Sequence, residues 1–137
     1  MYRKPLLSLL ALVAVYASAL AVVPLKDGSL TAESNGIAVI IRWMSEDESH
    51  VASFEIERRA GVNSQFFLLA AVTPNGSNSS YEYVDESAFR VGAESVYAYR
   101  LRVVYEDGSS EYSDEVTVVH AVSSVRRTWG SIKAMFR

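Results

Sequence analysis

Residues 95–122 read SVYAYRLRVVYEDGSSEYSDEVTVVHAV, and this stretch decides the fold class. Large apolar residues alternate with small or basic ones along its first half, which puts Tyr97, Tyr99, Leu101 and Val103 on one face and Ala98, Arg100, Arg102 and Val104 on the other. A period of two with β-branched and aromatic residues predicts a strand with one buried and one solvated face. Asp107-Gly108 is a strong hairpin signal, and residues 111–122 supply the returning strand.

Further strands are expected upstream of this hairpin. Strict alternation in GIAVIIRWM (residues 36–44) and in VASFEIERR (residues 51–59) predicts two of them. QFFLLAAV (residues 65–72) and YEYVDES (residues 81–87) predict two more, and GSLTAES (residues 28–34) is a short edge-strand candidate. Polar loops rich in Gly, Asn, Pro, Ser or acidic residues separate these segments.

The faces of these strands define the expected core. In residues 36–44 one face carries Ile37, Val39, Ile41 and Trp43, and in residues 51–59 Phe54 and Ile56 point inward while Glu55, Glu57 and Arg59 point outward. Phe66, Leu69 and Val72 share a face only if their strand contains a β-bulge. The predicted core consists of Trp43, Phe54, Ile56, Leu69, Tyr97, Leu101 and Val103. Burial of each large apolar side chain stabilises the fold by roughly 1.5–3 kcal/mol.

About seven strands with no helical period predict an all-β protein, an antiparallel β-sandwich of immunoglobulin-like architecture. The spaced core positions also resemble the fibronectin type III domains, across roughly residues 27–121. IIRW (residues 40–43) looks like the second strand of that family with its core tryptophan, and FEIERR (residues 54–59) looks like the third. Residues 97–118 look like the sixth strand, the hairpin and the seventh strand, with Tyr97 at the tyrosine-corner position.

The amino-acid sequences of these strands are similar to those of modules found in bacterial surface and type IX-secreted proteins. The resemblance therefore implies an exported bacterial protein, and it brings no catalytic signature. Two stretches depart from the family pattern. SEDES (residues 45–49) stands where a proline-rich turn is usual, and EDG (residues 106–108) stands where an integrin-binding hairpin carries RGD, so a role in cell adhesion is not carried over.

The N-terminal residues predict export. MYRKPLLSLLALVAVYASALAVVP (residues 1–24) places two cations before an uncharged run from Leu6 to Val23. This build is typical of a secretory signal peptide, with cleavage after Ala19 or Ala21. The alternative is a retained transmembrane anchor, because the run has the minimum length to span a bilayer. The expected parts are a signal peptide or anchor (1–23), the fibronectin type III-like domain (24–121) and a C-terminal tail (122–137).

Charge is divided unevenly along the chain. Residues 21–121 hold 7 Lys/Arg against 16 Asp/Glu, a net charge of −9, whereas residues 122–137 hold four cations and no acid. An acidic body argues against nucleic-acid binding, which needs clustered cations to neutralise phosphates. The absence of cysteine excludes disulfides, thiolate metal sites and a thiol nucleophile.

No residue pattern predicts catalysis, so the chain is expected not to be an enzyme and to need no cofactor. A metal site built from Glu46, Asp47, Glu48 and His50 is conceivable, but a solvated loop is the favoured interpretation. His120 is expected at the surface or at the domain boundary, and Glu55 and Glu57 on a solvated strand face. Exposed aromatic residues such as Tyr105 and Tyr112 suggest carbohydrate binding as a weak alternative.

The C-terminal tail is the expected partner-binding element. On a helical wheel its apolar residues gather on one stripe and its basic residues on the flank. The predicted contact residues are Arg126, Arg127, Trp129, Ile132, Lys133 and Phe136. A helix this short needs a supporting surface, which is its own sandwich, a groove on a partner or anionic lipid.

The sequence thus predicts a non-catalytic exported module of the bacterial cell envelope. It is expected to bind a protein partner through a strand edge or through the tail. The alternative is a single-span membrane subunit of a larger envelope complex, held by residues 6–23.

Overall fold

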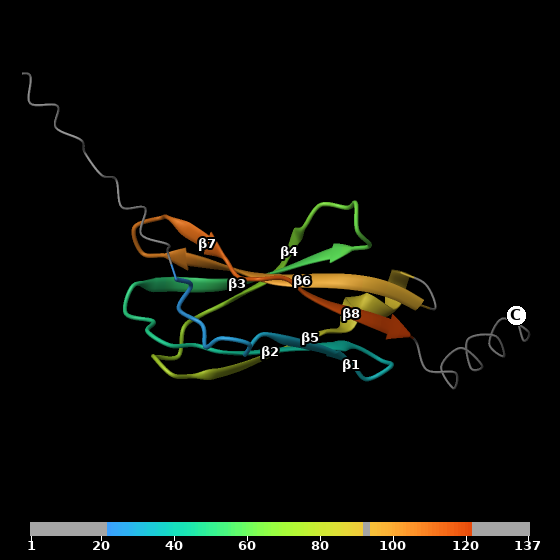
Figure 1. Ribbon diagram of the computed structural model, residues 1–137, viewed down its shortest axis with the longest axis horizontal. Helices are drawn as coiled ribbons and strands as arrows, with labels where there is room; N and C mark the ends of the chain where they lie inside the picture. Colours follow the sequence, from blue (N-terminus) through green and yellow to red (C-terminus); the bar gives the residue numbers. More distant parts are fainter. Residues whose placement is uncertain (1–21, 92–93, 122–137) are drawn as a thin grey trace, which may run out of the picture.

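The computed structural model describes residues 22–91 and 94–121, and these form two antiparallel sheets packed face to face (Figure 1). The smaller sheet has the order β1-β2-β5. The larger sheet has the order β4-β3-β6, with β7 and β8 both on the free side of β6. The strands are β1 (Thr31–Ser34), β2 (Val39–Met44), β3 (Val51–Ala60), β4 (Phe67–Val72), β5 (Ser80–Asp85), β6 (Glu94–Tyr105), β7 (Ser110–Tyr112) and β8 (Val116–Ala121), with a 3₁₀ helix η1 (Glu86–Val91) between β5 and β6.

The prediction of an all-β chain with antiparallel pairing is confirmed, and the face-to-face sheets fit a β-sandwich. Each predicted strand segment overlaps an observed strand. The segment predicted as one returning strand is divided into β7 and β8, because residues 113–115 leave the ladder between them. The hairpin at Asp107-Gly108 is confirmed. Gly108 adopts a φ of +86°, and its N–H donates to the carbonyl of Tyr105 over 3.0 Å.

The core lies between the sheets and matches most of the predicted set. Six of the predicted side chains are almost wholly buried: Trp43, Phe54, Ile56, Tyr97, Leu101 and Val103. Leu69 is only half-buried, because it lies on β4 at the margin of the core. Trp43 stacks on Tyr81 with ring centroids 5.0 Å apart, and Phe54 meets both rings. The predicted core, with Trp43 and Tyr97 buried between the sheets, is therefore present.

One face assignment was wrong, and a conditional one was met only in part. Ile37 precedes β2 and is 47% exposed, so it does not join Val39 and Ile41 in the core. The expected bulge occurs, since Ile56 pairs with Ala70 and Glu57 with Leu68, which leaves Leu69 as the extra residue of β4. Phe66 nevertheless lies before β4 on the outer side of the sheet, against the guanidinium groups of Arg59 and Arg100.

Candidate functional site

The residues predicted to bind a partner lie outside the described part of the chain. This applies to Arg126, Arg127, Trp129, Ile132, Lys133 and Phe136, and also to the apolar run before residue 22. Across residues 22–91 and 94–121, no helix is long and apolar enough to cross a membrane. The candidate site must therefore be sought on the sandwich itself, at its strand edges and on its outer faces.

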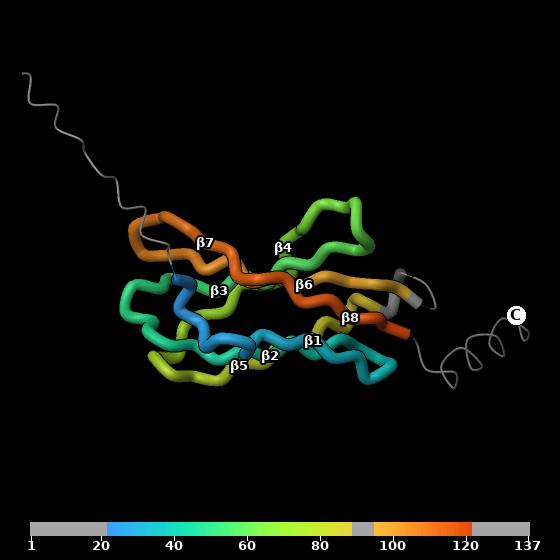
Figure 2. The backbone as a smooth tube through the Cα atoms, in the orientation of Figure 1, coloured from blue at the N-terminus to red at the C-terminus, as the bar shows by residue number. Residues whose placement is uncertain are grey.

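Two of the four sheet edges are close to each other. β1 and β8 lie side by side along one side of the sandwich, as the backbone trace shows (Figure 2). Ser34 of β1 and His120 of β8 share a hydrogen bond of 2.7 Å between Oγ and Nδ1. His120 is 1% exposed, so its predicted surface position was wrong. Because β1 and β8 cover each other, neither edge is fully open to a new strand.

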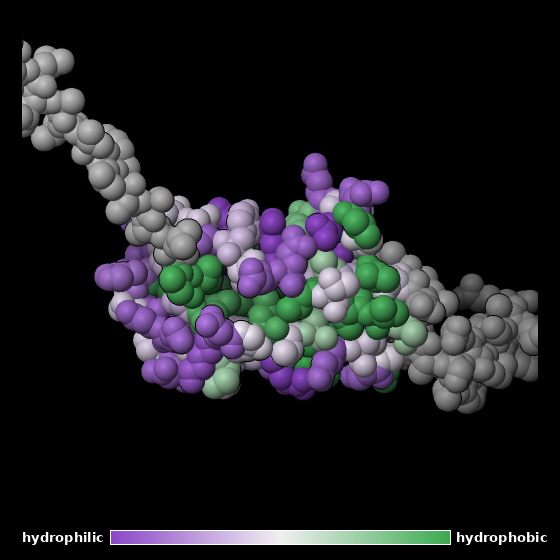
Figure 3. All heavy atoms as spheres, in the orientation of Figure 1, coloured by the Kyte–Doolittle hydropathy of each residue, from purple (hydrophilic) through white to green (hydrophobic). Residues whose placement is uncertain are grey.

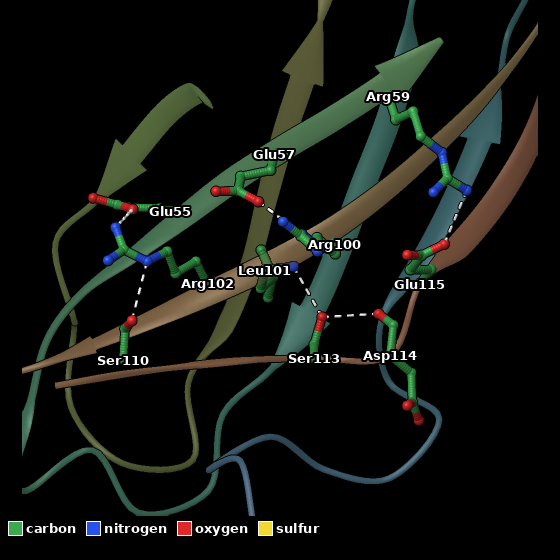
Figure 4. Close-up of polar contacts among 10 residues, drawn as sticks. All are labelled: Glu55, Glu57, Arg59, Arg100, Leu101, Arg102, Ser110, Ser113, Asp114 and Glu115. Atoms are coloured by element: carbon green, nitrogen blue, oxygen red, sulfur yellow. Dashed lines mark hydrogen bonds and ion pairs between the residues drawn. The ribbon is translucent and has the colours of Figure 1, made fainter. Parts of the chain in front are cut away.

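The edge formed by β7 and β8 is also irregular. Ser113 stands in the interval between the two strands. Its backbone N–H donates to the carbonyl of Leu101 over 2.9 Å. Its Oγ accepts the N–H of Leu101 over 2.9 Å, as Figure 4 shows. A side chain thus replaces one backbone carbonyl of the ladder. The edge strand β4, at the opposite side of the larger sheet, is interrupted by the bulge at Leu69. Bulges and breaks of this kind blunt a sheet edge against pairing with other strands.

β5 is the regular edge that remains among the described strands. All six of its residues pair with β2 in unbroken register, from Val39 opposite Asp85 to Met44 opposite Ser80. β5 contains neither proline nor lysine. Since β1 and β8 share one side of the sandwich, the free edge of β5 lies on the other side, where the larger sheet ends in β4. Such an edge offers unpaired backbone groups to an incoming strand.

The backbone groups that face outward can be assigned from the register. The N–H of Ser45 donates to the carbonyl of Ser79 over 2.9 Å, so this is a hydrogen-bonded pair. Hydrogen-bonded and non-hydrogen-bonded pairs alternate in an antiparallel ladder. Tyr81, Tyr83 and Asp85 therefore bond to β2, whereas Ser80, Glu82 and Val84 direct their N–H and C=O groups away from it.

The outer side chains along β5 form a short mixed surface. Val84 is 41% exposed and lies opposite the half-buried Ile40. The next pair on this face is Glu82 opposite Arg42. Nε of Arg42 is 2.8 Å from Oε2 of Glu82, and its Nη1 is 3.2 Å from Oε2 of Glu33 on β1. We call Glu33, Arg42 and Glu82 the acidic triad, because two carboxylates against one guanidinium leave a net charge of −1.

The inner side of β5 is fixed by a buried polar cluster. Oδ2 of Asp85 accepts hydrogen bonds from Nη1 of Arg58 at 2.6 Å and from the hydroxyl of Tyr99 at 2.7 Å. The hydroxyl of Ser87 donates to Oδ1 over 2.7 Å. Burial by itself raises the pKa of Asp85, but the hydrogen bonds from Ser87, Tyr99 and Arg58 outweigh it, so the pKa lies below its ordinary value. This cluster joins β5 to β3 and β6 and holds the edge strand in place.

The outer face of the larger sheet carries a ladder of ion pairs (Figure 4). Glu57 pairs with Arg100 at 2.7 Å, Glu55 with Arg102 at 3.0 Å, and Glu115 with Arg59 at 3.1 Å. Glu55 and Glu57 are thus half-buried and paired rather than simply solvated.

Arg100 is stacked as well as paired. The carbon of its guanidinium is 4.0 Å from the ring centroid of Phe66 and 3.8 Å from that of Tyr112. Tyr112 is 50% exposed, as the carbohydrate alternative requires, whereas Tyr105 is half-buried and donates to Glu111 over 2.8 Å. Because the charged groups on this face already have partners, it offers less to a ligand than the open edge of β5.

The acidic loop before β3 is built for structure. Glu48 is buried, and its carboxylate accepts hydrogen bonds from the Tyr81 hydroxyl and from the N–H of Gly76. Asp47 accepts the N–H of Ser49 over 2.9 Å. Two of the three acids of the conceivable metal site, Asp47 and Glu48, thus have different partners. The part of the chain that the structure covers contains no group of three metal-ligating side chains.

An apolar stripe also reaches the surface. Figure 3 shows hydrophobic residues gathered along the line where β1 and β8 meet. Leu30, Ala32, Val116 and Val118 are half-buried there and pack against the core. At one end, Leu25, Tyr112 and Val116 line an open groove of about 390 Å³.

Comparison with known proteins gives a likeness of fold. No family model and no curated protein matches the chain. The solved structure of the pectate lyase PelI from Erwinia chrysanthemi is similar, at 22% sequence identity and a TM-score of 0.51. The match covers 66% of this chain and 26% of the lyase chain, so this chain spans only about a quarter of the length of that enzyme. At this identity the similarity concerns the fold alone.

Sequence reasoning missed the polar cluster under β5, although a signal was present. Arg58 has the same parity as the inward residues Phe54 and Ile56, and Asp85 has the parity of Tyr81. The edge position of β5 carried no local signal, because it depends on which strands pair with which.

Proposed function

We propose that this chain is a non-catalytic, exported binding module of the bacterial cell envelope, and that it docks a protein partner through the free edge of β5. The observation that carries the proposal is the contrast among the sheet edges. In the described part of the chain, β1 and β8 cover each other, the β7/β8 edge is broken and β4 is bulged, while β5 is regular over six residues. A regular, unprotected edge is a template for strand addition.

The sandwich of this proposal is immunoglobulin-like and of the fibronectin type III kind. Its support is the strand order, in which the first, second and fifth strands make one sheet and the others make the second. Further support comes from Tyr97, whose hydroxyl donates to the backbone carbonyl of Ala88, nine residues upstream, over 2.9 Å. A tyrosine at the start of the strand that bonds back to the preceding backbone is a hallmark of this architecture.

A non-catalytic role is supported by how the buried ionisable groups are used. Asp85 is ion-paired with Arg58 and hydrogen-bonded to Tyr99, and Glu48 is hydrogen-bonded to Tyr81. A general acid or base must reach a reacting group in a substrate. These carboxylates instead face partners inside the protein, where they hold the two sheets and two loops together.

Crosslinking tests the docking strand. A photo-crosslinking amino acid at position 80 of the full chain, on the outer face of β5, should join the partner in envelope fractions of the producing cell. Val84→Pro should abolish the adduct, because proline removes an outward N–H without taking a donor from the β2 ladder. Val84→Ala serves as the matched control, since it removes the same side chain and keeps the N–H. An adduct of equal yield in both variants would show that β5 is not the docking strand.

Two parts of the proposal concern residues beyond the described range. Export followed by cleavage predicts a mature protein about twenty residues shorter, whereas a single-span subunit retains residues 6–23; the mass of the protein from cells distinguishes them. Docking through the tail predicts that replacing both Trp129 and Phe136 by alanine removes co-purification while the sandwich stays folded. Full co-purification of this double variant would leave the β5 edge as the docking element.

A further inference from the structure

The open edge of β5 also has a chemical preference. We infer that the strand it receives carries a basic residue opposite Glu82, with apolar residues two positions before and after it. This inference rests on the proposed docking through β5, and it names the class of partner: an extended peptide segment whose one face alternates apolar and basic side chains.

The register of the ladder fixes which side chains of the incoming strand meet which side chains of β5. Glu82 and Val84 direct their backbone groups outward, so a strand added there in antiparallel orientation, like the other strand pairs of the sandwich, forms hydrogen-bonded pairs with them. Side chains of directly opposed residues lie on the same face with Cβ atoms about 4.5–5.5 Å apart. The residue opposite Glu82 therefore joins the row of Glu82 and Arg42, and the residue opposite Val84 joins the row of Val84 and Ile40.

The acidic triad sets the charge at the central position. Glu82 already meets Arg42 on its β2 side, and the second contact of Arg42 is to Glu33. The side of Glu82 away from Arg42 faces the open edge, so its carboxylate is the charge that an incoming side chain meets first. A lysine or arginine opposite Glu82 neutralises this charge, while an acid there meets a carboxylate directly and is repelled.

Apolar side chains suit the two flanking positions. Opposite Val84, an incoming side chain extends the apolar row formed with Ile40. On the other flank, the row of Ser80 ends in Met44, which is 36% exposed. A β-branched residue at each flanking position covers this surface and favours the extended backbone.

A second copy of this chain fits the edge less well. If two β5 strands pair about Glu82, the two glutamates oppose each other on the same face, which is destabilising. If the two β5 strands are instead offset so that Glu82 of one copy opposes Val84 of the other, a carboxylate faces an apolar side chain. Neither the charge of Glu82 nor the apolar row at Val84 then has a complementary neighbour. The occupant is therefore a different segment, of basic and apolar character.

A peptide pair tests the inference. The probes are the labelled, end-capped peptide Thr-Val-Thr-Lys-Thr-Val-Thr and its analogue with Glu in place of Lys. Each is mixed with the full chain in detergent, and binding is measured by fluorescence anisotropy with the protein raised to millimolar concentration. We expect the lysine peptide to bind about threefold to tenfold more tightly than the glutamate peptide, the effect of one exposed charge pair changing sign. Hydrogen exchange of residues 80–85 should slow when the peptide binds. Val84→Pro should abolish the binding and, with it, this slowing.

Charge variants of the triad supply the matched control. Glu82→Lys should reverse the preference between the two peptides. Glu33→Lys changes the net charge equally but lies on β1, about three strand spacings of roughly 4.8 Å from the incoming strand. At physiological salt this distance exceeds the Debye length of about 8 Å. Glu33→Lys should therefore leave most of the preference for lysine.

The outcomes separate the two levels of the proposal. If both peptides bind with equal affinity and Val84→Pro abolishes this binding, the preference for a basic residue is overturned, while docking through β5 is supported. Binding of neither peptide, or binding that Val84→Pro does not affect, overturns both. Sedimentation of the chain alone measures whether it dimerises as its concentration rises. Dimerisation that Val84→Pro removes assigns the edge to a second copy and also overturns the inference.

Discussion

Arg58 and Asp85 form a buried ion pair that joins the two sheets. Nη1 of Arg58 on β3 lies 2.6 Å from Oδ2 of Asp85 on β5, and both side chains are less than a tenth exposed. The guanidinium also lies over the rings of Phe67 and Tyr97, at 5.0 and 4.9 Å from their centroids. The charge of Arg58 is thus compensated by one carboxylate and lies against two aromatic rings.

We predict that Asp85→Ala destabilises the fold by about 3–5 kcal/mol, because it leaves an uncompensated buried guanidinium. Urea unfolding followed by tryptophan fluorescence measures the change. The matched control is Arg42→Ala in the exposed acidic triad, which should cost much less, because solvent-exposed ion pairs contribute little to stability. Equal losses in both variants would show that Asp85 has no special role.

Asp85 should also make stability depend on acid pH. Its pKa in the folded state lies below the ordinary value of 3.8. A carboxylate whose pKa is lowered by folding contributes stability that is fully present above its ordinary pKa and lost as the pH falls through the folded value. Between about pH 5 and pH 2, the free energy of unfolding of the wild type should therefore fall more steeply than that of Asp85→Asn. Parallel curves would contradict this assignment, because the remaining acids are common to both proteins.

The alternation of side chains predicted the strands and most of the core, but not the polar interior. Residues 51–59 place Phe54 and Ile56 inward, and the same period places Arg58 inward too. A charged residue is normally assigned to the solvent, and its burial here depends on Asp85, which lies on a strand of the other sheet. Such pairings follow from tertiary packing, so a single strand cannot reveal them. The candidate edge was hidden for the same reason, since strand order arises only when both sheets form.

Tyr97→Phe should destabilise the protein by about 1–3 kcal/mol. The Tyr97 ring is fully buried, and its hydroxyl donates to the carbonyl of Ala88 over 2.9 Å. Removal of the hydroxyl leaves a buried carbonyl without this donor. Tyr112→Phe, at a half-exposed position, should change stability by no more than about 0.5 kcal/mol. Thermal unfolding by circular dichroism compares the two, and a similar loss in each would argue against the tyrosine-corner role.

The ion pairs on the outer face of the larger sheet should stabilise the fold through pairwise interactions rather than through single charges. Arg100 pairs with Glu57 and lies between the rings of Phe66 and Tyr112. A double-mutant cycle with Glu57→Gln and Arg100→Gln should give a coupling energy of about 0.5–1 kcal/mol, which falls as salt rises. The Tyr112–Arg100 cycle, with Tyr112→Ala, should give a similar value that depends less on salt. Coupling near zero in both cycles would show that this face is only solvated.

Glu48 should control the loop that leads into β5. Its two carboxylate oxygens accept from the Tyr81 hydroxyl and from the N–H of Gly76, and the Tyr81 oxygen accepts the N–H of Asn75 over 2.7 Å. Glu48→Gln replaces one acceptor by an NH₂ group, which must face either the Gly76 donor or the Tyr81 hydroxyl. A buried donor loses its acceptor in either orientation: the N–H of Gly76 in the first, and in the second the O–H of Tyr81, whose oxygen then accepts from the amide instead. The cost is about 1–3 kcal/mol.

The consequence should be visible just before β5. Hydrogen exchange of residues 75–80 should speed up in Glu48→Gln, because this turn loses its anchor to the other loop. Glu46→Gln is the matched control, since Glu46 lies in the same loop with an exposed side chain. If exchange is unchanged in Glu48→Gln, or rises equally in Glu46→Gln, then the turn is held by its own backbone and the carboxylate does not position β5.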